Sequence, residues 1–89
     1  MSEETAIEAE ILRQVEAIGA DKSICPSEVA RAMAPDWRTK LSAVRRAAIR
    51  LAVAGRIDIL RKGRPVDPIS VKGVIRLRLP IAPDPAGEA

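Results

Sequence analysis

The sequence predicts one small α+β domain, in which three helices are followed by an antiparallel β-hairpin. Apolar residues recur at helical spacing as far as residue 54, and after Gly55 they alternate with charged residues, as in a strand. The 89 residues, of which 47% are hydrophobic and 30% are charged, suffice for a single core. We therefore expect one domain over residues 1–82 and a flexible C-terminal tail at residues 83–89.

The first two helices are bounded by residues that favour helix ends. Ser2 is a good N-cap for the first helix, and Gly19 suits its C-cap. Pro26 fits the first turn of a second, short helix, which should end at Ala34 because Pro35 disfavours helical backbone in the residue before it. The apolar residues expected to face inward from these two helices are Ile7, Ile11, Leu12, Val15, Ile18, Val29, Ala30 and Met33.

The third helix is expected to be the longest, running from Trp37 to about Ala54 with Asp36 as its N-cap. At about 100° per residue, one stripe of this helix is apolar and predicts Trp37 in the core rather than as a platform for stacking bases. Ile49 and Val53 fall outside the stripe and would need cover from the hairpin or from a second subunit. The stripe consists of Trp37, Leu41, Val44, Ala48, Leu51 and Ala52.

Two strands are predicted at residues 57–60 and 75–79, where apolar and charged residues alternate. The connecting loop, residues 61–74, is rich in bases and too long for a two-residue hairpin turn. Asp67 within it is expected to form a local hydrogen bond that shapes a turn. The order of helices, tight turn, long basic helix and hairpin matches the winged-helix variant of the helix-turn-helix.

Charge is strongly segregated along the chain. The first 21 residues carry six acids and one base, whereas residues 22–82 carry fourteen bases and four acids, so the formal net charge of +3 hides a basic segment. A segment with this excess suits a polyanionic partner, and nucleic acid is the commonest one. We therefore expect the protein to bind duplex DNA.

The DNA-binding residues are expected on the third helix and on the loop between the strands. The third helix has no acid after Asp36, and arginine can engage guanine or phosphate with two parallel hydrogen bonds. The loop would act as the wing, along the backbone or in the minor groove. The candidates are Arg38, Thr39, Ser42, Arg45, Arg46 and Arg50 on the helix, and Lys62, Arg64 and Lys72 on the loop.

Other interpretations of the same residues stay open. The basic helix face could serve solubility, and the loop bases could protect an edge strand from pairing with other chains. A winged helix can also be a protein-interaction module without affinity for nucleic acid. A homodimer would suit palindromic DNA.

Several segments are similar to a small bacterial family called domain of unknown function 3253. They are ICPSEVAR at 24–31, DWR at 36–38, VR at 44–45, GRI at 55–57, RKGRPVDP at 61–68 and KGVIRLR at 72–78, and together they span nearly the whole chain up to about Leu79. The resemblance implies a winged-helix domain. It implies no activity, so no functional residue follows from it.

The composition argues against the other main classes of function. The sequence has no His and no metal-ligand cluster or glycine-rich phosphate loop, so we expect neither an enzyme nor a cofactor. The single cysteine, Cys25, is expected to be a buried apolar residue, with a redox-sensitive thiol as the alternative. The N-terminus does not resemble a signal peptide and no apolar stretch approaches about 20 residues, which predicts a cytoplasmic protein away from membranes.

Overall fold

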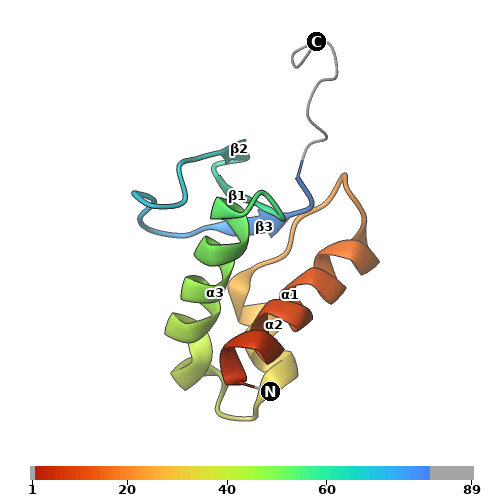
Figure 1. The fold of residues 1–89 in the computed structure, drawn as a ribbon, viewed down its shortest axis with the longest axis vertical. Helices are drawn as coiled ribbons and strands as arrows, with labels where there is room; N and C mark the ends of the chain where they lie inside the picture. The colour runs from red at the N-terminus through yellow and green to blue at the C-terminus, as the bar shows by residue number, and fades with distance from the viewer. Residues whose placement is uncertain (1, 81–89) are drawn as a thin grey trace.

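The structure, a computed structural model, describes residues 2–80. The predicted tail at 83–89 and the last two residues of the predicted domain lie outside the described residues. Figure 1 shows three helices gathered on one side of a small sheet, an α+β arrangement compatible with a winged helix. The elements are α1 (Glu3–Ile18), α2 (Pro26–Met33), the 3₁₀ helix η1 (Trp37–Lys40), α3 (Leu41–Val53), β1 (Asp58–Arg61), β2 (Arg64–Pro65) and β3 (Arg76–Arg78).

The ends of α1 and α2 follow the predicted local chemistry. The Ser2 hydroxyl accepts a hydrogen bond from the Thr5 backbone N–H at 3.2 Å, and Gly19 ends α1 with a φ of 94°. At α2, Pro26 occupies the first turn and the Glu28 carboxylate accepts from the backbone N–H of Cys25 at 2.8 Å. Both helices therefore begin where their capping residues predict.

The third helix departs from the single element expected from Trp37 to Ala54. Its first four residues form η1, and the α-helix begins only at Leu41. The Thr39 N–H and hydroxyl both donate to the Asp36 carbonyl, at 3.0 and 2.8 Å, and the Leu41 N–H donates to the carbonyl of Arg38. These bonds between residues three apart tighten the entry into a 3₁₀ turn.

The sheet has three antiparallel strands in the order β2-β1-β3. The expected antiparallel pairing of the two predicted strands is confirmed by β1 and β3, and β2 is an additional strand within the loop expected over 61–74. Lys62 and Gly63, with φ of 55° and 80°, make a two-residue turn that pairs Arg61 with Arg64. A second connection then returns the chain to the other edge of β1. We call this connection, residues 66–75, the wing segment; Figure 1 shows it reaching out beyond α3.

The core lies where the three helices meet the sheet, and Ile24, between α1 and α2, joins it by exchanging two 2.8 Å backbone hydrogen bonds with Leu77. Trp37 is only half-buried at the edge of this core, which corrects its predicted burial. Ile49 is covered by the core, whereas Val53 stays 61% exposed. The core consists of Ile7, Ile11, Val15, Ile24, Val29, Ala30, Val44, Ala47, Ala48, Leu51, Ile57, Ile59, Ile75 and Leu77.

Within residues 2–80, none of the helices has the length and apolar character needed to cross a membrane.

Candidate nucleic-acid interface

The acids of α1 pair with bases on one side of η1 and α3. Glu3 binds the Lys40 ammonium at 2.6 Å, and this hydrogen bond raises the pKa of Lys40. Arg50 lies 2.7 Å from Glu8 and 3.7 Å from Glu4. The structure therefore turns Arg50, one of the predicted DNA-binding residues, toward α1.

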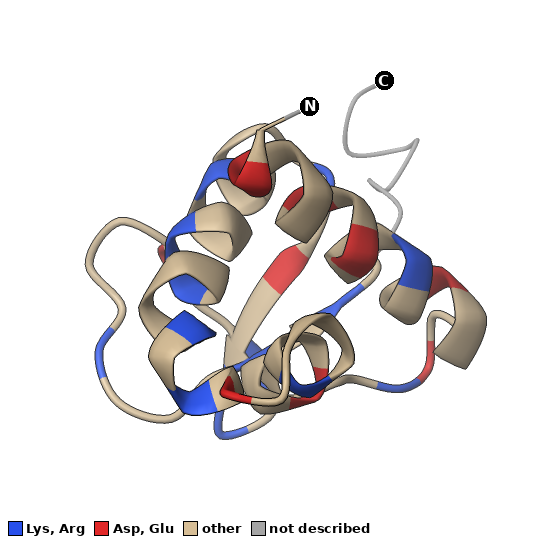
Figure 2. Cartoon of the chain, turned by 90° about the horizontal axis from the view of Figure 1, so that it is seen from below, with Lys and Arg blue, Asp and Glu red and all other residues tan. Residues whose placement is uncertain are grey.

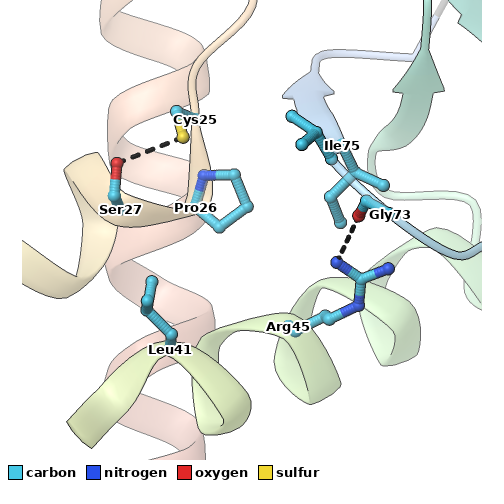
Figure 3. Close-up of a pocket in the computed structure, with 8 residues that line it drawn as sticks. Cys25, Pro26, Ser27, Leu41, Arg45, Gly73 and Ile75 are labelled. Carbon is cyan, nitrogen blue, oxygen red and sulfur yellow. Dashed lines mark hydrogen bonds between the residues drawn. The ribbon is translucent and has the colours of Figure 1, made fainter. Parts of the chain in front are cut away.

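Arg45 points the other way and holds the wing segment. Its guanidinium donates to the carbonyl of Gly73 at 2.9 Å and to the carbonyl of Val71 at 3.4 Å, and Figure 3 shows the first of these bonds crossing from α3 to the wing segment. Arg61 of β1 donates to the carbonyl of Val74 at 3.3 Å. We call these three hydrogen bonds, from Arg45 and Arg61, the clamp.

Gly73 is fitted closely into the clamp. Its φ is 83°, in the left-handed region that favours glycine, and a Cβ at this position would overlap the guanidinium of Arg61. The clamp thus depends on a residue without a side chain at this point of the wing segment.

Arg46 and Ser42 lie on the exposed part of α3, as predicted. Among residues 2–80, Arg46 has no ion pair or hydrogen bond that would hold its guanidinium. Arg45, Arg46 and Arg50 occupy little more than one helical turn, yet one holds the wing segment, one is free and one pairs with α1.

The bases of the β1–β2 turn and of the wing segment are also exposed. Lys62 lies in the turn, Arg64 begins β2, and Lys72 lies between two carbonyls of the clamp. None of the three forms an ion pair in the described part of the chain. Figure 2 shows Lys and Arg bands along α3 and along the wing segment that arcs beside it, with several Asp and Glu bands along α1.

Arg38 and Thr39 belong to η1 and are engaged locally. The Arg38 guanidinium lies 4.4 Å from the centre of the Trp37 ring, and Arg31 of α2 lies 4.6 Å from it. Such cation–π contacts hold arginine over the electron-rich ring face. The Thr39 hydroxyl donates to Asp36, so it bonds within its own turn.

Two further bases fix the frame of the sheet. Arg76 of β3 donates to the hydroxyl of Ser23 at 2.6 Å and to its carbonyl at 2.9 Å. Arg78 lies 3.6 Å from Asp58, its cross-strand partner in β1.

Within α1, Arg13 donates to Glu10 at 2.6 Å, which lowers the pKa of the Glu10 carboxyl and raises the pKa of Arg13.

A pocket of about 280 Å³ separates the start of α2 from the wing segment, with α3 as its floor. Leu41, Pro26 and Val74 give it apolar walls. Cys25 at its edge is half-buried rather than buried as expected, and its sulfur accepts a hydrogen bond from the Ser27 hydroxyl at 3.1 Å. Arg45, which also lines this pocket, donates two of the three hydrogen bonds of the clamp.

Arg31 and Arg61 are not among the residues predicted from the sequence. Gly63 suits one of the two positive-φ positions of a two-residue turn, and a turn predicted there would have placed Arg61 at a strand end. Nothing in the spacing of Arg31 indicates its contact with Trp37, which depends on how α2 and η1 pack. The predicted local bond of Asp67 is confirmed, since its carboxylate accepts from the backbone N–H of Ile69 at 3.0 Å.

The described residues contain no group of three or more His, Cys, Asp and Glu placed to hold a metal ion.

The chain belongs to the family described as protein of unknown function (DUF3253), whose model matches residues 4–80. A search of curated proteins found no match. The family resemblance expected from the sequence is therefore confirmed, and it brings no activity with it.

Proposed function

We propose that this member of the DUF3253 family binds duplex DNA through the exposed face of α3 and the wing segment. Its role would be that of a small bacterial transcription-type factor in the cytoplasm, which binds DNA without acting on it chemically. Binding to a palindromic site would require a homodimer.

The main support is that four bases are exposed and unpaired in the described part of the chain, while acids of α1 pair with other bases. Arg46, Lys62, Arg64 and Lys72 have no ion-pair partner among residues 2–80. The α1 acids pair with Lys40 and Arg50 instead, and none of the described acids pairs with Arg45 or Arg46. Exposed, unpaired bases attract a polyanion because binding releases the counterions of its phosphates.

The shape of the face also supports the proposal. An α-helix such as α3 is about 10–12 Å across with its side chains, and the major groove of B-DNA is about 12 Å wide, so the groove can admit this helix. Ser42 and Arg46 would then reach base edges or phosphates, while Lys72 would meet the backbone. Arg45 would contribute by placing the wing segment through the clamp.

The test is fluorescence anisotropy with a random-sequence duplex of about 30 base pairs, repeated over a range of salt concentrations. We expect binding that weakens steeply with salt, and Arg46→Ala should reduce the logarithmic salt slope by about one phosphate contact. Arg13→Ala is the matched control, since it removes the same charge from α1, where Arg13 pairs with Glu10. Absence of binding at low salt, or equal losses in the two variants, would contradict the proposal.

A second candidate function is a protein-interaction module. It is favoured by the apolar pocket between α2, α3 and the wing segment, whose wall includes Val74 with 80% of its surface exposed. Val74→Asp should weaken the binding of a protein partner that inserts an apolar side chain into this pocket. The same substitution would test DNA binding too, because it adds an acid to the proposed face.

A further inference from the structure

The wing segment exposes two large apolar side chains. Ile69 is 72% exposed and Val74 is 80% exposed, more than any other large hydrophobic residue in the described part of the chain. Val74 borders the pocket beside α3, whereas Ile69 is not among the pocket's lining residues. Ile69 is thus an apolar side chain that the fold leaves without cover.

Hydrogen bonds fix the backbone that carries Ile69. On one side, Asp67 accepts from the Ile69 N–H at 3.0 Å, and Pro68 between them has a restricted φ. On the other side, the clamp binds the carbonyls of Val71, Gly73 and Val74. Hydrogen bonds on both sides of Ile69 therefore hold the backbone in a conformation that exposes its side chain. This exposure is unfavourable in water, because an isoleucine gains free energy when it is buried.

The charges around Ile69 suit DNA. Lys72 is three residues away in the same segment, and Lys62 of the β1–β2 turn and Arg64 of β2, which precede the segment, are also exposed. Asp67 is the single acid of the wing segment, and one of its oxygens is occupied by the Ile69 N–H. Proteins that bind the minor groove contact it with basic residues and frequently insert an apolar side chain as a wedge between base steps.

We propose that Ile69 inserts into the minor groove of bound duplex DNA, partly unstacks one base step and kinks the helix. This inference rests on the proposed function and adds a mode of binding to it. The wing segment reaches out beyond α3 (Figure 1). With α3 in the major groove, this segment would be the part of the protein that contacts the adjacent minor groove. Asp67, Pro68 and the clamp position the isoleucine for insertion.

The test uses a duplex of about 30 base pairs that contains flexible TA and CA steps and carries a fluorophore at each end. Binding of the wild-type protein should raise energy transfer between the ends, because a wedge of this kind bends DNA by about 20–90°. Ile69→Ser should bind with an unchanged salt slope, because no charge is lost, and should lose most of the rise in energy transfer. Ile69→Leu should keep the rise in energy transfer.

Val53→Ser is the matched control, because Val53 is also largely exposed but lies at the end of α3. It should bend DNA as the wild type does. A wild-type protein that binds with a steep salt slope and leaves energy transfer unchanged would overturn the wedge alone. Equal bending by the wild type and Ile69→Ser would also overturn it. Failure of the wild type to bind at low salt would overturn the proposed function itself.

Discussion

Gly73→Ala should destabilise the domain more than the same change at Gly63. The two glycines have nearly equal φ angles, 83° and 80°, so an alanine meets similar backbone strain at each. A Cβ at Gly63 meets no atom within 4 Å, whereas a Cβ at Gly73 overlaps the Arg61 guanidinium. The comparison therefore separates the packing of the clamp from the strain of a left-handed residue.

The expected magnitudes follow from these contacts. Left-handed backbone costs an alanine about 1–2 kcal/mol, partly offset by the lower entropy of the unfolded chain. At Gly73 the flexible Arg61 side chain must also move away, which breaks its hydrogen bond to Val74 and adds about 1 kcal/mol. Gly63→Ala should thus lower the free energy of unfolding by about 1 kcal/mol and Gly73→Ala by about 2 kcal/mol.

Urea denaturation followed by circular dichroism measures both values, and a double-mutant cycle with Arg61→Ala tests the cause. Without the arginine, Gly73→Ala should cost only the strain that Gly63→Ala shows. In thermal denaturation the difference between the two glycine variants should appear as about 4–8 °C in Tm. Equal losses at the two glycines, or an additive cycle, would refute the assignment of Arg61 to the clamp.

Two further predictions concern the core and the pH dependence of stability. Ile11→Ala should lower the free energy of unfolding by about 3 kcal/mol because Ile11 is fully buried, while Ile18→Ala, at a 37% exposed residue, should cost under about 1 kcal/mol; urea titration of both variants checks this. Because folding lowers the pKa of Glu10, the stability that Glu10 contributes is present above its ordinary pKa and is lost as the pH falls through the folded value. Wild type should therefore exceed Glu10→Gln in stability at pH 7 and lose that advantage in acid, as unfolding curves at pH 7 and pH 3 will measure; a constant difference would contradict it.

The features predictable from the sequence are those decided within a few residues. Ser2 and Gly19 bound α1 because a hydroxyl and a left-handed glycine satisfy helix ends locally. Asp67 forms its turn with a residue two positions away. The apolar periodicity likewise identified most of the core, since a helix face and its burial repeat together.

The features that the sequence did not predict depend on residues far apart in the chain. Trp37 shares the apolar stripe of the third helix, but the η1 turn and the two arginines over its ring keep it at the edge of the core. The strand β2 is only two residues long, which is too short to show an alternating pattern of apolar and polar residues in the sequence. Its pairing with β1 depends on the turn conformation of Lys62 and Gly63.

The candidate site shows the same limit more sharply. Helical periodicity places Arg46 and Arg50 opposite the apolar stripe and Arg45 on its flank, and all three were predicted to contact DNA. Their roles differ because α3 is flanked by different neighbours, α1 on one side and the wing segment on the other. Only the packing of these elements decides which guanidinium stays free.

The packing of α1 explains which bases among residues 2–80 stay without an ion-pair partner. Ile7, Ile11 and Val15 are at most 1% exposed, so burial fixes the rotation of α1 about its axis. That rotation places Glu3, Glu4 and Glu8 against Lys40 and Arg50, with little further ordering needed for these ion pairs to form. The acids therefore neutralise bases beside α1 and leave Arg46 and Lys72 uncompensated. The formal charge of +3 thus does not show where the unpaired bases lie, and their position decides where a polyanion would bind.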